Sequence, residues 1–233
     1  MVNSPTRFSD IQNHWARLFI EGLATRGIIS GFPDGTFQPN RAMTRAQFAA
    51  VIQKAFPKPV KRPNVPFVDV PANHWAAAAI QNAYQTGFMS GYPGNRFLPE
   101  NSIARMEALI SLVAGLEIPS TLSPIDAILR ELYQDTAQIP AYALEKIAAA
   151  TEGQLVVNYP NLKQLRPLEV ATRAEVAAFI YQALVYLGKV PPIASDYIVV
   201  YQKTIALSHQ REFRGVWAAT VWNLDWPSQK GLP

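Results

Sequence analysis

The feature that most constrains this chain is an internal repeat. A segment covering residues 8–47 returns as residues 67–107, and most matching positions lie 60 residues apart, as Trp15 and Trp75 do. A third, altered copy runs from Tyr133 to Glu175. A repeat of this size usually forms one supersecondary unit that cannot bury its apolar face alone. The sequence therefore predicts three similar units that pack on one another.

Each unit is predicted to be a helix, a turn-rich loop and a second helix. In the first copy, Asn13 is a candidate N-cap for a helix that opens at His14 and keeps helical apolar spacing to Leu23. Gly27 follows the end of this helix, where a left-handed residue is common. The loop contains the tight-turn sequence Pro33-Asp34-Gly35.

The second helix of each unit begins with a capping signal. Thr44 and Gln47 are spaced as in a capping box, and Thr172 begins the same pattern in the third copy. The second copy has Ala104 at this position, a loss that typically costs about 1 kcal/mol of helix stability. An extra helix is predicted after Ser123-Pro124, with the serine as cap and the proline in the first turn.

Composition excludes several classes of protein. Of 233 residues 49% are apolar and 16% are charged, which favours a folded chain, and the net charge of +4 suits an acidic partner but is too small to argue for nucleic acid. There is no cysteine and no apolar run long enough to span a membrane. His14, His74 and His209 lack the accompanying ligands of a metal site. We expect no cofactor, no metal and no transmembrane segment.

The order of motifs resembles the S-layer homology (SLH) module over residues 8–188. The resemblance rests on Phe-x-Asp-Val, His-Trp-Ala, Pro-Asp-Gly-Thr-Phe-x-Pro and Thr-Arg-Ala-Glu patterns, the last intact at residues 172–175. It implies a mainly α fold in which three helix-loop-helix repeats close into a pseudo-threefold bundle with grooves between neighbours. It also implies non-covalent anchoring of an exported protein to a secondary cell-wall polysaccharide or a peptidoglycan-linked glycan, often pyruvylated.

The end of the chain differs in character. Residues 197–207 are rich in β-branched and aromatic residues, which predicts a short β C-terminal tail. Residues 211–228 resemble the opening strand of a glycosyl-hydrolase-like (family-10-like) barrel, a fold that needs about 250 residues. Glu212 and Asp225 therefore have no expected catalytic role, and we predict no catalytic residue in this chain. No signal-peptide pattern precedes the first repeat, so export rests on the resemblance alone.

These patterns divide the chain into six segments. Residues 1–57 and 64–116 are the first two repeats, followed by an inserted helix and linker at 117–132. Residues 133–188 are the degenerate third repeat, 189–210 a linker and strand, and 211–233 the truncated start of the barrel.

The arginine that opens the second helix of each repeat is the first candidate for ligand binding. A helix N-terminus has unpaired N–H groups that favour an anion, and a guanidinium adds a planar fork that matches a carboxylate. The alternative is an ion pair with an aspartate, such as Asp10, Asp69 or Asp135, that holds the repeat together. The three arginines are Arg45, Arg105 and Arg173.

The other candidates surround the loop. Trp15 and Trp75 either stack on a sugar or pack in the core. Asp34 and Gly35 lie at the tip of the loop, and we expect Gly31, Gly35 and Gly91 to adopt backbone conformations forbidden to other residues. The predicted site is a glycan groove lined by Arg45, Trp15 and residues 33–37. Because the third copy is altered, we expect the three grooves to differ.

Two other functions remain open from the sequence. The repeats could form a helical adaptor that binds proteins rather than sugar. A wall-glycan hydrolase activity could reside in a C-terminal barrel beyond residue 233. The oligomeric state is not indicated by any pattern.

Overall fold

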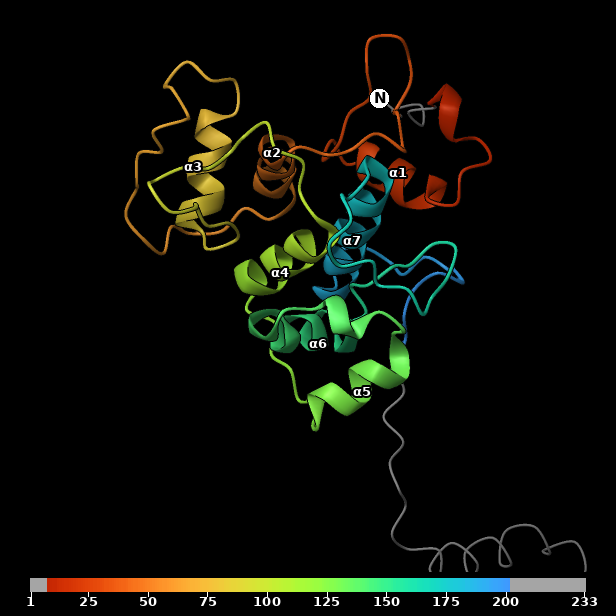
Figure 1. Ribbon diagram of the computed structural model, residues 1–233. Helices are drawn as coiled ribbons and strands as arrows, with labels where there is room; N and C mark the ends of the chain where they lie inside the picture. Colours follow the sequence, from red (N-terminus) through yellow and green to blue (C-terminus); the bar gives the residue numbers. More distant parts are fainter. Residues whose placement is uncertain (1–7, 202–233) are drawn as a thin grey trace, which may run out of the picture. The chain divides into compact units, whose positions relative to one another are not determined.

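The computed structural model describes residues 8–201, and Figure 1 labels their helices. This part of the chain is mainly α-helical, as predicted, and its few β-type pairs are isolated bridges. One bridge joins Val157 to Ile198, while most of the predicted β tail and all of residues 211–233 lie outside the described residues. The α-helices of residues 8–201 are α1 (Arg17–Ala24), α2 (Arg45–Ala55), α3 (Ala77–Gln85), α4 (Arg105–Leu116), α5 (Ile125–Leu132), α6 (Leu144–Glu152) and α7 (Arg173–Tyr186).

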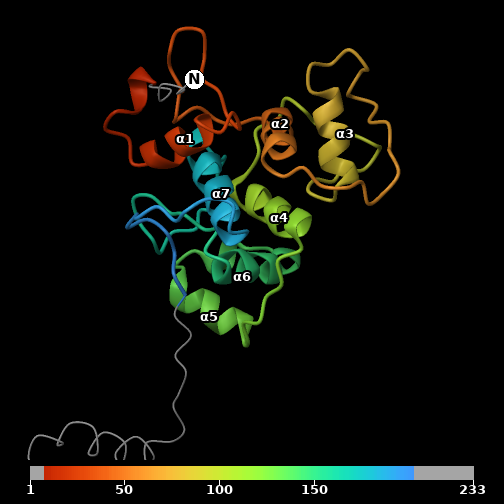
Figure 2. The same ribbon diagram turned by 180° about the vertical axis from the view of Figure 1, so that it is seen from behind.

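The repeats are joined by helix packing that crosses from one repeat to the next. The second helices of the three repeats, α2, α4 and α7, are the inner ones, and α7 contacts both of the others. Each first helix packs on the inner helix of the preceding repeat: α3 on α2, α6 on α4, and α1 on α7. Figure 2 shows the same arrangement from behind. The chain thus closes a three-membered ring, and α5 packs on the outside against α6.

A cycle of backbone hydrogen bonds lies where the three repeats meet. The N–H of Met43 donates to the carbonyl of Ala171 (3.0 Å), that of Ala171 to Ile103 (2.8 Å), and that of Ile103 to Met43 (2.9 Å). All three side chains are buried in the core. Each repeat donates to one neighbour and accepts from the other, so the closure predicted as a pseudo-threefold bundle is present at the level of single peptide groups.

An aspartate fixes the loop of each repeat. The two carboxylate oxygens of Asp10 accept hydrogen bonds from the backbone N–H groups of Phe37 (2.8 Å) and Gln38 (2.7 Å). Asp69 and Asp135 make the equivalent pairs of bonds in the other two repeats. These aspartates therefore orient local backbone and do not pair with the arginines that open the inner helices.

The loop glycines serve two different purposes. Gly35 has a φ of +79°, as predicted, and Gly27 after the first helix has +69°. The same prediction was wrong for Gly31 and Gly91, which do not have positive φ. At Gly31 a Cβ atom would lie 2.4 Å from the Phe8 ring and 2.5 Å from the carbonyl oxygen of Thr36, so this glycine is required by close packing.

Two predicted helix starts differ from the structure. The first helix begins at Arg17 rather than His14, and no side chain caps it. Instead, His14 Nδ1 accepts a hydrogen bond from the Ala16 N–H (3.2 Å), which satisfies a backbone group that Asn13 was expected to serve. The extra helix, α5, begins at Ile125, with the predicted first-turn Pro124 at the N-cap position and no side-chain cap bond.

The inner helices provide a matched test of capping. Thr44 Oγ1 accepts a bond from the Gln47 N–H (3.2 Å) and Gln47 Oε1 accepts one from the Thr44 N–H (3.2 Å), whereas at Ala104 only the Glu107 half of the box remains (3.3 Å). Replacing Thr44 with Ala should lower the free energy of unfolding by about 1 kcal/mol. The change Ala104→Thr should raise it by about the same amount. Urea denaturation of the two variants measures both effects, and a destabilised Ala104→Thr variant would contradict the capping account.

Candidate functional site

The arginine that opens each inner helix is buried and reaches into the loop of a neighbouring repeat. The Arg45 side chain donates from Nε to the carbonyl of Phe97 (2.9 Å) and from Nη2 to that of Ser90 (3.0 Å). Arg173 does the same toward Phe37 (2.9 Å) and Ser30 (3.0 Å). Because a carbonyl in the interior is costly to leave unpaired, these bonds fasten the loops to the helices.

The starts of the inner helices have fewer free N–H groups than predicted. The N–H of Arg45 donates to the carbonyl of Asn101 (2.9 Å) and that of Ala46 to Pro99 (2.9 Å), both in the next repeat. The third N–H, that of Gln47, donates to the Thr44 side chain. The helix terminus therefore joins two repeats here, and the predicted anion site on these N–H groups does not match the geometry.

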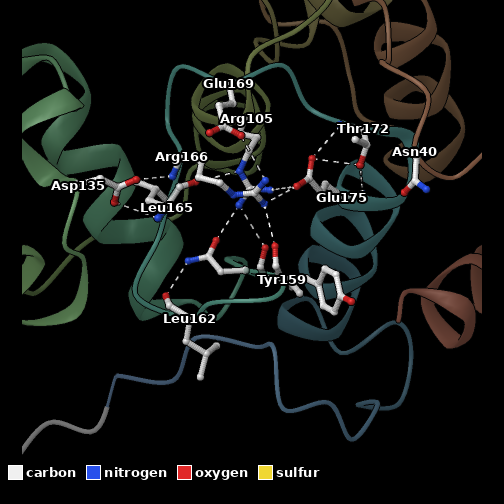
Figure 3. Close-up of polar contacts among 12 residues, drawn as sticks. Asn40, Arg105, Asp135, Tyr159, Leu162, Leu165, Arg166, Glu169, Thr172 and Glu175 are labelled. Atoms are coloured by element: carbon white, nitrogen blue, oxygen red, sulfur yellow. Dashed lines mark hydrogen bonds and ion pairs between the residues drawn. The ribbon is translucent and has the colours of Figure 1, made fainter. Parts of the chain in front are cut away.

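Arg105 is the most deeply buried of the three arginines, with no exposed surface. Figure 3 shows its polar contacts. Its Nε donates to the carbonyl of Leu165 (2.9 Å), and its Nη2 donates to Asn158 Oδ1 (2.7 Å). Its Nη1 forms an ion pair with Glu175 Oε1 (2.7 Å), which Arg166 Nη2 also contacts (2.5 Å). Burial lowers the pKa of Arg105 to about 10, and the Glu175 charge opposes that shift, so the guanidinium stays charged at neutral pH.

The carboxylate of Glu175 balances this cluster. Burial acts to raise the pKa of Glu175, but the charge of Arg105 and the hydrogen bond from the Thr172 N–H (2.9 Å) act against it. Together with Arg166 they outweigh burial, and the pKa of Glu175 lies below its ordinary value. The group is therefore an ion at neutral pH, held between two arginines.

One groove on the described surface combines residues of all three repeats. It is a pocket of about 190 Å³ formed by the loop and inner helix of the first repeat, Trp75 of the second and Arg173 of the third. The Trp75 side chain is 64% exposed, and burial lowers the pKa of the Arg173 guanidinium, which lies over the Phe37 ring at 4.4 Å. We call this pocket the first groove; its lining is Ile28, Ile29, Ser30, Phe37, Met43, Gln47, Ala50, Val51, Lys54, Trp75 and Arg173.

The second groove is the equivalent place one repeat further along the chain. Here the arginine is Arg45, whose guanidinium lies over the Tyr92 ring at 4.7 Å. The Tyr92 hydroxyl donates to Glu107 Oε1 (3.0 Å), and Glu107 Oε2 lies 3.8 Å from Arg45 Nη1. Tyr142 stands where the first groove has Trp75 and is also exposed. The side chains of Arg45, Tyr92 and Glu107 thus contact one another.

The third groove is closed by the chain's own aromatic side chains. Trp15 stacks on Tyr159 with ring centroids 5.3 Å apart and planes 9° from parallel. Tyr197 packs edge-on against Tyr159 (4.8 Å), and its carbonyl accepts a hydrogen bond from the Asn158 N–H (2.9 Å). The predicted difference between the grooves is therefore confirmed, and Trp15 has the packing role that the sequence left open.

The structure does not assemble the groove predicted from Arg45, Trp15 and residues 33–37. Those elements belong to three different grooves, because each groove takes its arginine from the preceding repeat and its tryptophan or tyrosine from the following one. The loop of the first repeat instead lies with Trp75 and Arg173. Sequence reasoning within one repeat could not find this combination.

Asp34 and Gly35 shape the tip of the loop and do not line the first groove. Asp34 Oδ1 accepts bonds from the Thr36 hydroxyl (2.6 Å) and N–H (2.9 Å), and the hydroxyl bond is the main cause of its lowered pKa. The carbonyl of Gly35 accepts the Ser9 N–H (3.1 Å). Ligand contact by these two residues remains a prediction.

The remaining sequence candidates are accounted for by local contacts. His14 Nε2 lies 3.2 Å from Asn40, and His74 Nε2 lies 3.2 Å from Glu100. Within residues 8–201 no three potential metal-ligating side chains gather, and no helix there is both long and apolar enough to cross a bilayer. His209, Glu212 and Asp225 lie outside the described residues.

Comparison with known proteins identifies the repeats. Residues 7–49 and 66–109 match the S-layer homology domain. The chain carries S-layer homology domains. The two matched segments coincide with the first two repeats, and the third repeat joins them through the same loop, arginine and backbone contacts.

The relatives include enzymes and surface proteins that are much longer than the matched region. The chain is similar to an exoglucanase (XynX) of Acetivibrio thermocellus, with 33% identity over 79% of this chain and 17% of the relative. It is 34% identical to a cellulosome-anchoring protein of the same species over 49% of this chain and 27% of the relative. It is 30% identical to the S-layer protein EA1 of Bacillus anthracis, over 48% and 13%.

The buried cluster around Arg105 gives a test of what holds the ring together. Replacing Glu175 with Gln should lower the free energy of unfolding by about 3–5 kcal/mol, because it leaves Arg105 buried without its counterion. An ordinary glutamate pKa is about 4.3. The pKa of Glu175 in the folded chain lies below this ordinary value. The stability that its charge contributes to the fold is therefore fully present above about pH 4.3, and it is lost as the pH falls through the pKa of the folded chain. The variant should therefore lose less stability than the wild type on acidification.

Glu169→Gln is the matched control. The Glu169 side chain is 61% exposed and its bond to Arg166 is 3.3 Å long, so its loss should cost at most about 1 kcal/mol. Chemical denaturation of both variants from neutral pH to about pH 3 separates the two cases. Equal stability and equal acid sensitivity in both variants would show that the buried pair does not hold the repeats.

Proposed function

We propose that the three repeats anchor an exported protein non-covalently to an anionic cell-wall polysaccharide, and that the first groove is the principal binding site. The names of the relatives support this at a general level, because they include a cellulosome-anchoring protein and an S-layer protein. In this proposal the repeats bind and do not catalyse. The location that follows from it is the cell envelope.

The observation that carries the proposal is the composition of the first groove. Trp75 offers a largely exposed indole, a flat apolar surface of the kind that stacks on the apolar face of a sugar ring. Arg173 and Lys54 line the same pocket and carry positive charge. Within residues 8–201 no ion pair involves Lys54. Two cations beside an aromatic ring suit a sugar that bears a carboxylate, such as a pyruvyl ketal.

The size of the pocket favours recognition of one sugar residue. Sites for drug-sized ligands are usually about 300–1,000 Å³, and the first groove is smaller, at about 190 Å³. It suits a single substituted sugar whose neighbours in the polymer run over the surface. Tight retention on a wall would then come from many copies of the sugar presented to one protein, or from more than one groove.

The whole protein's activity is a separate proposal. The chain matches only 17% of the length of the exoglucanase and 10% of an amylopullulanase of Thermoanaerobacterium thermosulfurigenes. We propose that the repeats attach a larger glycosyl-hydrolase-like protein to the wall, and that any hydrolysis is carried out by a part of that protein other than these 233 residues. Reducing-sugar release by the 233-residue chain would contradict this division of labour.

Trp75→Ala is the direct test of the first groove. Because the indole is mostly exposed, its removal should leave the melting temperature within a few degrees of the wild type. Binding to cell-wall sacculi from the source organism should weaken about tenfold or more, since aromatic anchors dominate such contacts. A sedimentation assay over a range of sacculus concentrations measures the change.

Tyr142→Ala is its matched control, because Tyr142 has the equivalent position in the second groove and is 73% exposed. It should leave binding unchanged if the first groove is the principal site. Equal losses in both variants would assign the two grooves equal roles. Wild-type binding that persists on sacculi stripped of polysaccharide would favour a protein partner and overturn the glycan proposal.

A further inference from the structure

We infer that residues 195–199 are a strap that binds in the third groove as an extended peptide, holds that groove closed to other ligands, and can leave it while the repeats stay folded. The strap belongs to the segment that the sequence predicts as a linker and strand. Its role needs no glycan and is independent of the proposed anchoring function.

The chain turns back after the last inner helix and so reaches the third groove. Gly188 has a φ of +66° beyond the end of α7, and the N–H of Lys189 donates to the carbonyl of Leu184 (2.9 Å). The Tyr181 hydroxyl then donates to the carbonyl of Pro191 (2.9 Å), which fixes the start of the return. In the first two repeats the chain runs on into the next repeat instead.

The strap pairs with one backbone edge of the third groove. The N–H of Asn158 donates to the carbonyl of Tyr197 (2.9 Å), and the N–H of Val199 donates to that of Val156 (2.9 Å). An antiparallel β-bridge lies between these two bonds. Addition of an extended segment to an exposed backbone edge is a general mode of peptide recognition. The main chain of the strap is therefore bound as that of a peptide ligand would be.

The Tyr197 ring packs on the aromatic side chains of the same groove. It lies edge-on to Tyr159 (4.8 Å, 82°) and to Trp15 (6.1 Å, 77°). Trp15 has the position that Trp75 has in the first groove, where the indole is largely exposed. A ligand that stacks on Trp15 would have to compete with both tyrosines for the ring. The strap thus makes the third groove unavailable to such a ligand.

The equivalent backbone edges of the other two repeats carry no strap. Asn158 follows the carbonyl that the opening arginine binds, and Gly31 and Gly91 have the same place in their repeats. Within residues 8–201, no hydrogen bond engages the N–H of either glycine, whereas the N–H of Asn158 is paired with the strap. The strap therefore satisfies a backbone group that the other two grooves leave unpaired.

The loop that forms the wall of the third groove is held without the strap. Arg105 Nε donates to the carbonyl of Leu165 (2.9 Å), and Asp135 accepts the N–H of Leu165 (3.0 Å; Figure 3). Asn158 Nδ2 donates to the carbonyl of Leu162 (2.9 Å) within the same loop. None of these bonds uses a residue of the strap. The loop can therefore keep its shape when the strap opens as a small local unit.

Hydrogen exchange followed by NMR on the full 233-residue chain tests whether the strap opens by itself. The amides of Asn158 and Val199 should have matching protection. They should be at least about tenfold less protected than the amide of Ala171, which lies in the backbone cycle where the repeats meet. Equal protection at all three amides would mean that the strap opens only when the repeats unfold, and would overturn the inference.

Tyr197→Ala loosens the strap, and Tyr197→Phe is its matched control. Loss of the ring contacts should lower the protection of Asn158 and Val199 about tenfold and leave that of Ala171 unchanged. Tyr197→Phe should behave as the wild type, because no hydrogen bond engages the Tyr197 hydroxyl within residues 8–201. An equal fall in protection at Ala171 in Tyr197→Ala would show that the strap is part of the core, contrary to the inference.

A synthetic peptide of residues 189–199 tests whether the third groove binds this sequence as a ligand. A tethered segment has an effective concentration in the millimolar range, so the peptide is added at millimolar concentration. It should restore the protection of Asn158 in the Tyr197→Ala chain, because the altered strap is the weaker competitor. The same peptide carrying Tyr197→Ala should have no effect, and neither peptide should change the wild type.

Restored protection by both peptides, or by neither, would overturn the inference. No polysaccharide enters these measurements, so either result leaves the proposed anchoring function as it stands.

Discussion

The structure depends on one buried contact made three times: an arginine at the start of an inner helix donates to two carbonyls in the loop of a neighbouring repeat. Each contact spans two repeats, so no repeat can complete its own loop alone. The backbone cycle through Met43, Ile103 and Ala171 has the same property. The last of the three contacts forms only when the third repeat closes on the first, because Arg173 donates to carbonyls of the first repeat.

This closure also determines which side chains meet in each groove. Each groove collects a loop and a helix from one repeat, an arginine from the repeat before and an aromatic side chain from the repeat after. The three grooves therefore have a common plan and diverge through single substitutions. Tyr159 and Tyr197 fill one groove, Glu107 and Tyr92 bond across another, and the remaining one is lined by Arg173, Lys54 and Trp75.

Much of the fold could be predicted from residues that act locally. The capping box at Thr44 and the left-handed Gly35 both follow from side-chain chemistry within a few positions. The role of Gly31 could not, because the Phe8 ring that excludes a side chain there comes from a separate turn of the chain. The first groove could not be predicted for the same reason, since it depends on contacts between distant parts of the chain. Trp75 and Arg173 were candidates, but their meeting depends on ring closure, which a single repeat does not reveal.

The opening arginines have more N–H donors than their contacts to the loop carbonyls use. A guanidinium has five N–H donors, and the two carbonyl contacts that fasten a loop use only part of them. The Nη1 atoms of Arg45 and Arg105 lie beside the carboxylates of Glu107 and Glu175. A fully buried guanidinium without such a carboxylate would be costly. Arg173 is less completely enclosed than Arg105, with 8% of its surface exposed against none, so water reaches it at the groove. Arg173 therefore combines two buried contacts to loop carbonyls with an edge that faces the pocket.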